Sequence, residues 1–268
     1  HNDIVTFTGS ATTGKILKSH PNILENSVPF NMEADSLNAC VLGEDVDESS
    51  DEFDIFIKEI YREMTAKTGQ KCTAVRRILV PENKIDQVQK ALITKLEKTI
   101  IGNPENKDVR MGALASKIQV ERVKENVELL MESQEKVFDN SSNLNLVDAS
   151  EEKGAFFSPV LFRNDEPFLK DAVHNIEAFG PVSTLIPYKN MEESVELVKM
   201  GKGSLVTSFV SNDDKKSKEF VVETAHTNGR ILVLNSRCSK ESTGHGSPMP
   251  QLAHGGPGRA GGGEEMGG

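Results

Sequence analysis

Cys72 lies in the stretch "TGQKCTA" (68–74), between a polar, glycine-containing approach and a β-branched run. A cysteine at a turn before a strand can receive backbone N–H donors, which lower its pKa and later stabilise an oxyanion. Cysteine is also among the most often buried residue types. Cys72 is therefore a candidate nucleophile, with a packing role as the alternative.

A nucleophile of this kind needs a nearby acid or base, and two carboxylates stand out. Glu33 in "FNMEADSLN" follows a strand-like apolar segment rather than lying on a polar helix face. Glu177 in "NIEAFGPV" is followed by Phe-Gly-Pro, which forces a turn and so fixes the position of the carboxylate. Either signal is weak by itself, and Glu33 can equally be interpreted as a surface carboxylate at a strand end.

Two glycine-containing segments resemble phosphate-binding turns. In "FTGS" (7–10), Gly9 and Ser10 end a strand-like run and precede a helix, so backbone N–H groups there can face a phosphate. Gly256-Pro-Gly258-Arg-Ala-Gly261 matches G-x-G-x-x-G, but the last predicted strand ends at residue 235 and no helix is expected to follow. We interpret this second pattern as a by-product of glycine richness, and we predict a loop or flexible tail over 255–268.

The elements that position these residues alternate between strands and helices. At 49–67, for example, Ser and acidic residues open a segment in which Phe53, Ile57 and Ile60 share one helical face. Such alternation predicts an α/β fold, with a mostly parallel sheet flanked by helices. The predicted strands lie at 3–9, 28–33, 37–42, 73–81, 136–140, 155–164, 181–188, 204–212 and 229–235, and the predicted helices at 11–20 (ended by Pro21), 49–67, 83–98, 117–133, 191–199 and 214–226.

Composition excludes several classes of protein. The 268 residues carry a net charge of -10 without a long basic run, so nucleic acid is not an expected partner. No apolar run approaches the ~20 residues of a membrane helix. The three cysteines are far apart, so neither a metal site nor a disulfide framework is expected. With no signal peptide evident, we expect a cytoplasmic protein. A start without Met, directly in a strand, suggests an excerpt of a longer chain.

Taken in order, "FTGS", Glu33, "GQKC" and "EAFGPV" resemble the aldehyde dehydrogenase superfamily, and the resemblance runs from Phe7 to the glycine-rich end. "FNMEADSLNACVLG" and "STGHGSPMPQLAHGGPGRAGGGEEMGG" narrow it to the dehydrogenase part of the bifunctional proteins of phenylacetic acid degradation. The semialdehyde dehydrogenases of benzoyl-CoA degradation come next. The resemblance implies that this chain has the fold of the aldehyde dehydrogenase catalytic domain. It also implies the NAD(P)-dependent oxidation of an aldehyde to a carboxylic acid.

The resemblance also assigns roles. Cys72 would attack the aldehyde to form a thiohemiacetal, and hydride would pass to the nicotinamide. Glu33 would activate the water that releases the acid from the thioester. The substrate implied is the semialdehyde of a ring-cleaved CoA thioester, with NADP as acceptor and NAD possible, in a homo-oligomeric parent. The residues implied to face the cofactor are Gly9 and Ser10 at the pyrophosphate, Glu177 at the nicotinamide ribose and Phe179 near the ring.

The sequence departs from the family pattern in two places. Many members read E-L-G-G-K around the base, whereas "ADSLN" follows Glu33, so the loop after the base differs. "GHGSPMPQLAHGGPG" replaces a short Gly-Tyr-Lys segment near the end, which supports the subfamily but weakens any transfer of aldehyde-pocket residues. We expect a remnant of the nucleotide-binding domain at 1–34, the catalytic domain at 35–239 and a glycine-rich segment at 240–268. The family's first half, with an oxyanion-hole Asn and a ribose-binding Lys, would precede residue 1.

Two other classes of function are open from the sequence. A cysteine hydrolase would pair Cys72 with His174 or His226, and it requires an imidazole nitrogen beside the sulfur. A non-catalytic assembly module would use this half of the family fold only as an interface.

Overall fold

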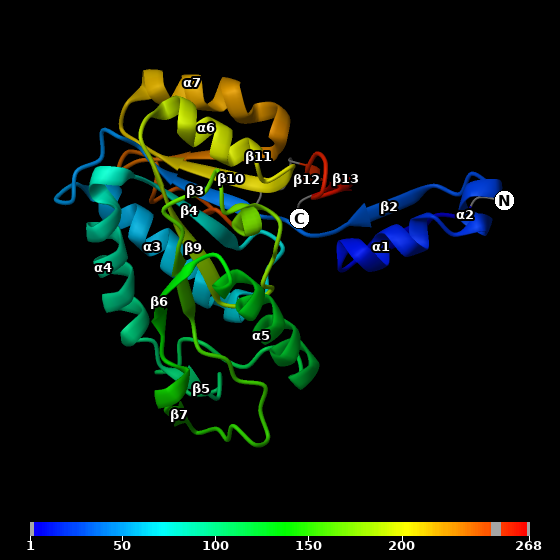
Figure 1. Cartoon of the computed structure of the whole chain (residues 1–268), viewed down its shortest axis with the longest axis horizontal. Coiled ribbons are helices and arrows are strands. Elements are labelled where there is room, and N and C mark those ends of the chain that lie inside the picture. The colour runs from blue at the N-terminus through cyan, green and yellow to red at the C-terminus, as the bar shows by residue number, and fades with distance from the viewer. Residues whose placement is uncertain (1–2, 248–252, 267–268) are drawn as a thin grey trace.

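A seven-stranded sheet forms the centre of the computed structural model, which describes residues 3–247 and 253–266 (Figure 1). The strand order is β11-β10-β3-β4-β9-β8-β6, and all neighbours pair in parallel except β6 with β8. The predicted α/β fold with a mostly parallel sheet is therefore confirmed. The strands are β3 Asn38–Leu42, β4 Val75–Pro81, β6 Glu135–Asp139, β8 Val160–Arg163, β9 Val182–Tyr188, β10 Ser204–Val210 and β11 Asn228–Leu234.

Helices cover both faces of this sheet, so its central strands are buried on both sides. Residues of α3 Asp51–Thr65 and α4 Ile85–Glu97 pack on one face together with Cys40 and Leu42 of β3. Residues of α6 Met191–Lys199 and α7 Asp214–Thr224 pack on the other face with Ala39 and Val41. The alternation along β3 follows from the period-2 geometry of a strand.

The predicted helix at 49–67 illustrates how local chemistry sets an element. The Ser50 hydroxyl accepts a hydrogen bond from the Phe53 backbone N–H, and three acidic residues occupy the first turn. Both features stabilise the amino end of a helix. Phe53, Ile57 and Ile60 are all buried against the sheet, as their spacing predicted.

Helix α5 Lys117–Met131 packs against β8 and β9. Its buried side chains recur at helical spacing, at Val120, Val123, Val127 and Leu130. Near it, β5 Ile101–Gly102 and β7 Leu146–Val147 form a small parallel pair. No described helix has the length and apolar character needed to cross a membrane.

The first part of the chain forms a separate strip that extends away from the large sheet (Figure 1). Strands β1 Val5–Thr8 and β2 Phe30–Glu33 pair in parallel, joined by α1 Ala11–Lys18 and α2 Pro21–Glu25. Pro21 was expected only to end the first helix. That helix ends at Lys18, and Pro21 starts α2, where its fixed φ suits the first helical position.

The prediction of a loop or tail over 255–268 is wrong for the described residues. β12 Ala253–Gly255 and β13 Gly262–Met266 form an antiparallel hairpin, while residues 267–268 lie outside the described part. The hairpin is anchored by hydrogen bonds from the Ala34 N–H to the Ala260 carbonyl and from the Arg259 N–H to the Lys202 carbonyl. A Cβ built at Gly261 would lie 2.0 Å from the Met32 carbonyl oxygen, so glycine permits this close backbone approach.

The G-x-G-x-x-G match lies in the turn of that hairpin. Strand β12 directly precedes Gly256, contrary to expectation, but β13 follows it rather than a helix. The helix that a dinucleotide fingerprint requires is therefore missing from this described segment.

Phe209 of β10 stacks on Phe220 of α7, with ring centroids 4.4 Å apart, and both side chains are fully buried. We expect Phe209→Ala to lower the free energy of unfolding by about 3–5 kcal/mol, because it leaves a cavity between sheet and helix. Val222→Ala, at an exposed position of α7, is the control and should change it by less than about 0.5 kcal/mol. Chemical denaturation measures both, and equal effects would contradict this packing.

Candidate active site

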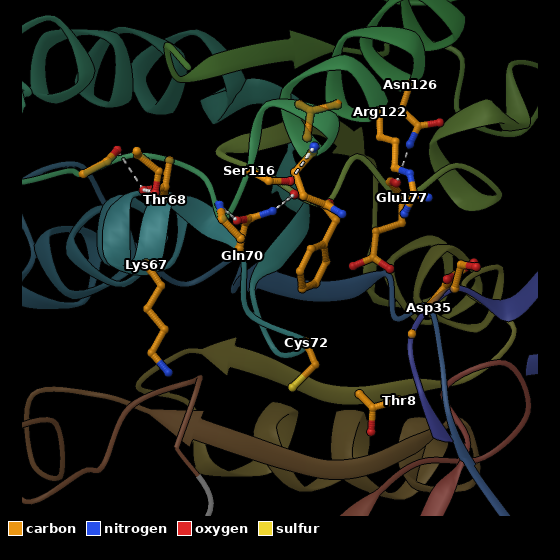
Figure 2. Close-up of a pocket in the computed structure, with 18 of the residues that line it drawn as sticks. Thr8, Asp35, Lys67, Thr68, Gln70, Cys72, Ser116, Arg122, Asn126 and Glu177 are labelled. Atoms are coloured by element: carbon orange, nitrogen blue, oxygen red, sulfur yellow. Dashed lines mark hydrogen bonds between the residues drawn. The ribbon is translucent and has the colours of Figure 1, made fainter. Parts of the chain in front are cut away.

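A cavity of about 960 Å³ lies where the β1–β2 strip meets the large sheet. The strip contributes the carboxyl ends of its two strands, through Thr8 and Glu33. The large sheet contributes segments that precede β4 and β9, including Cys72 and Glu177. Figure 2 shows Cys72 and Glu177 directed into this space from those two segments. The carboxyl ends of β1 and β2 and the amino ends of β4 and β9 thus meet at one cavity. Ligands of open α/β sheets usually lie only at the carboxyl ends of the strands.

All six residues predicted for the site line this cavity, although they come from distant parts of the sequence. They are Gly9, Ser10, Glu33, Cys72, Glu177 and Phe179. The sequence motifs therefore describe one place in the fold.

The segment 67–73, here called the Cys72 turn, begins with an unusual backbone. Lys67, Thr68 and Gly69 have φ angles of 51°, 55° and 68°, all in the left-handed region. This region is strained for a β-branched residue such as Thr68. The Thr68 hydroxyl donates a hydrogen bond to the Gly112 carbonyl (3.0 Å), which helps to hold the conformation. A Cβ built at Gly69 would lie 2.3 Å from the Gly180 carbonyl oxygen, so only glycine fits there.

The end of the Cys72 turn is fixed from two sides. The Asn38 side-chain amide donates to the carbonyls of Cys72 (2.8 Å) and Ala74 (3.0 Å). The Thr73 hydroxyl donates to the Gly246 carbonyl (3.2 Å). Asn38 begins β3, so the first residue of the neighbouring strand fixes the backbone at Cys72 and directly after it.

Burial raises the pKa of the Cys72 thiol above its usual value, and the negative charges of Glu33 and, more weakly, Glu177 raise it further. The backbone N–H groups of Thr73 and Cys72 act in the opposite direction. The N–H donors expected from the sequence are therefore present, but they do not dominate. Because its pKa lies above the usual value, Cys72 is a neutral thiol at pH 7.

Glu177 is held by two donors on the wall of the cavity. Its carboxylate accepts a hydrogen bond from the Ser36 N–H (3.0 Å) and an ion-paired bond from Arg76 Nε (3.3 Å). Burial raises the pKa of Glu177 to about 7, a shift that Arg76 opposes and that the charge of Asp35 reinforces. The Asn126 side chain also donates to the Glu177 carbonyl (3.0 Å). Both the side-chain carboxylate and the backbone carbonyl of Glu177 are therefore held by hydrogen bonds.

Two residues of the site were missed by the sequence analysis. Gln70 bridges the cavity wall: its side-chain oxygen accepts from the Ala115 N–H (2.8 Å), and its nitrogen donates to the Phe179 carbonyl (3.2 Å). Arg76 lies within β4, where a buried parallel strand is expected to be apolar. Two successive arginines in "TAVRRILVP" were the available signal, because a charged residue in such a run needs a specific partner.

The histidine arrangement of a cysteine hydrolase is not supported. None of the described residues lining the cavity is a histidine. Both ring nitrogens of His174 are engaged elsewhere, with Arg77 (3.2 Å) and with the Pro167 carbonyl (3.1 Å). Burial, with the charge of Arg77, lowers the pKa of His174 to about 3. His226 lies exposed in a short turn after α7.

Comparison with known proteins shows which family this chain matches. The family model described as "Aldehyde dehydrogenase family" matches residues 1–267. A 3,4-dehydroadipyl-CoA semialdehyde dehydrogenase from Aromatoleum evansii is 42% identical over 255 residues, which cover 95% of this chain and 50% of that protein. Protein MaoC from Klebsiella aerogenes is 45% identical over 159 residues, which cover 59% of this chain and 46% of that protein. The chain thus spans about half the length of these relatives.

Solved structures share the fold. Betaine aldehyde dehydrogenase from Staphylococcus aureus, in complex with NAD+, superposes with a TM-score of 0.83 at 23% identity, covering 99% of this chain and 50% of that one. Succinic semialdehyde dehydrogenase from Streptococcus pyogenes, in complex with NADP+, superposes with a TM-score of 0.78 at 20% identity, covering 98% and 52%.

The charge of Glu33 gives a direct prediction for the thiol. Glu33→Gln removes a negative charge near the Cys72 sulfur, so the pKa of Cys72 should fall and more thiolate should exist at pH 7.5. We expect iodoacetamide to alkylate Cys72 about threefold or more faster, as followed by mass spectrometry of the Cys72 peptide. Glu219→Gln, at an exposed position of α7, is the control. An unchanged rate in Glu33→Gln would mean that its charge does not act on the thiol.

Proposed function

The chain belongs to the aldehyde dehydrogenase family, and we propose that it forms the catalytic part of an NAD(P)-dependent enzyme that oxidises an aldehyde to a carboxylic acid. The observation that carries the proposal is that Cys72 and Glu33 line one cavity, with the Glu33 charge close enough to act on the thiol. A nucleophile and a base facing the same space are what acyl transfer through a cysteine requires.

The residues of the cavity fit a dinucleotide. Gly9 and Ser10 connect the carboxyl end of β1 to the amino end of α1, a turn suited to a phosphate group. The Glu177 carboxylate suits ribose hydroxyl donors, and the partly exposed ring of Phe179 offers an apolar surface to a nicotinamide. We assign these four residues to cofactor binding, with NADP preferred and NAD possible. The cofactor supplies the hydride acceptor for the oxidation.

The Cys72 sulfur attacks the aldehyde carbon, and a C–S bond forms while the thiol proton is released. This proton passes to solvent, so Glu33 stays ionised for the second half of the reaction. After hydride loss from the same carbon, the substrate remains as a thioester on Cys72. Glu33 then takes a proton from a water molecule, which attacks the thioester carbon. The C–S bond breaks, the carboxylic acid leaves, and the thiol is restored.

The substrate we propose is a semialdehyde carried by a CoA thioester of aromatic degradation. The 42% identical relative is named for such a substrate. The cavity is also lined by three cations, Lys67, Arg110 and Arg122, in a chain whose net charge is -10. Arg110 is oriented by a hydrogen bond from its Nε to the Thr65 hydroxyl (2.9 Å) and by the Tyr61 ring, 5.5 Å away. Three carboxylates, Glu33, Asp35 and Glu177, also line the cavity, so an anionic carrier would contact these cations rather than the carboxylates.

For the whole protein we propose a cytoplasmic homo-oligomer. We propose three parts for this chain: a nucleotide-domain strip at 1–34, a catalytic domain at 35–239 and a glycine-rich segment at 240–268. The β12–β13 hairpin of the glycine-rich segment forms hydrogen bonds with both other parts, to Ala34 of the strip and to Lys202 of the catalytic domain. The glycine-rich segment would thus help to hold the strip in place.

Cys72→Ala in the full-length protein should abolish aldehyde oxidation, a loss of at least about a thousandfold in kcat. Cys238→Ala is the matched control, because the Cys238 sulfur contacts the backbone of β11 and does not line the cavity. Reduced cofactor is followed by its absorbance. Turnover retained by a folded Cys72→Ala protein would contradict the proposal.

Glu33→Gln should separate the two halves of the reaction. Because Glu33 acts on water in deacylation, a single burst of reduced cofactor should remain while steady turnover falls by about a hundredfold or more. Stopped-flow absorbance resolves the two phases. If burst and steady rate fall together, Glu33 is not the deacylation base.

A further inference from the structure

Arg76 makes contacts to two separate segments of the cavity wall. Its side chain is 4% exposed, near the start of β4. Nη2 donates to the Gly69 carbonyl (2.8 Å) and more weakly to the Lys71 carbonyl (3.4 Å), both in the Cys72 turn. One guanidinium therefore fixes the strained backbone that leads to the nucleophile.

The same guanidinium holds the segment that precedes β9. Nη1 donates to the Gly180 carbonyl (2.6 Å), and Nε pairs with the Glu177 carboxylate (3.3 Å). Its central carbon lies 5.5 Å from the centre of the Phe179 ring. All the residues of segment 177–180 that we assign to the cofactor are thus in contact with Arg76.

The planar fork of arginine makes this double contact possible. A guanidinium presents five N–H donors in a fixed geometry, whereas a lysine ammonium is a single point charge. A lysine at this position would keep the charge but could not reach Gly69, Gly180 and Glu177 together. Burial makes the loss consequential, because no bulk water is available to replace the missing donors.

The next residue provides a natural comparison. Arg77 is also fully buried, but it points to the other face of the sheet. It donates to the carbonyls of Leu37, Leu197 and Val198 and contacts His174. None of these four groups belongs to the Cys72 turn or to segment 177–180. Arg77 therefore shares the chemistry and burial of Arg76 without its connection to the cavity.

We propose that Arg76 is a positioning residue that fixes two parts of the cavity wall. One is the Glu177 carboxylate, which binds the sugar of the cofactor, and the other is the Cys72 turn, from which the thiol attacks the aldehyde. The cofactor half of this inference rests on the function proposed above. The Cys72 half does not, because it concerns the chain's own backbone and thiol.

Arg76→Lys in the full-length protein tests both ends with readouts other than turnover. Without cofactor, the alkylation rate of Cys72 by iodoacetamide should change at least about threefold, because the turn is no longer held. The dissociation constant for NADP, measured by calorimetry, should rise at least about fivefold, because Glu177 loses its fixed orientation. Arg77→Lys should lower the melting temperature but leave both quantities within about twofold.

A double-mutant comparison tests the route through Glu177. In a Glu177→Gln background, Arg76→Lys should change the NADP dissociation constant by less than about twofold, while its effect on Cys72 alkylation should persist. A full effect on NADP in that background would mean that Arg76 acts on the cofactor by another route, and would overturn the inference.

Other outcomes also decide the matter. If Arg76→Lys changes only one of the two quantities, or if Arg77→Lys changes both equally, Arg76 is a structural residue and the inference fails. If Arg76→Lys and Arg76→Gln both fail to fold while Arg77→Lys folds, the role is likewise structural. If the wild-type protein binds neither NADP nor NAD, the proposed function fails together with the cofactor half, while alkylation still decides the Cys72 half.

Discussion

The left-handed backbone of Lys67, Thr68 and Gly69 is the constraint on which the site depends. A non-glycine residue in a sparsely populated φ/ψ region costs about 1–3 kcal/mol, so the surrounding structure must compensate. Here the compensation comes from the Thr68 hydroxyl bond to Gly112 and from the buried Arg76 beneath Gly69. Lys67, Thr68 and Gly69 lie in the connection between the end of α3 and the start of β4. Cys72 follows in the same connection and lines the cavity.

The electrostatics of the cavity follow from the same arrangement. Two carboxylates and a thiol share a partly buried space, so each negative charge opposes ionisation of the sulfur. Arg76 offsets one of these carboxylates, Glu177, through their ion pair. The result is a thiol that is neutral at rest, and a thiol is a weaker nucleophile than its thiolate.

Elements set by local chemistry were predictable from the sequence. The helix at 51–65 has a capping serine and an apolar stripe, and β10 is rich in β-branched and apolar residues, so their types follow from their own residues. The order of the four motifs placed all six site residues on one cavity. This grouping was expected from resemblance to a family, because spacing alone does not bring Glu33 near Cys72.

Features that depend on distant partners could not be predicted in this way. Glycine has a low strand propensity, yet residues 253–255 and 262–266 form a hairpin because the turn between them bonds to Ala34 and Lys202. The role of Arg76 depends on β9 lying beside β4, which is a matter of sheet order. The direction of the Cys72 pKa shift was also missed, since it results from burial and carboxylates that only the fold brings together.

The central claim is that the Cys72 sulfur forms a covalent bond with the carbon of the substrate aldehyde. The most direct measurement incubates full-length Glu33→Gln protein with NADP and a short aliphatic semialdehyde, quenches with acid, and analyses the peptides by mass spectrometry. The account predicts that the Cys72 peptide gains the mass of the aldehyde less two hydrogen atoms, as a thioester requires. Reduced cofactor formed without any adduct on Cys72, or an adduct on another residue, would contradict it.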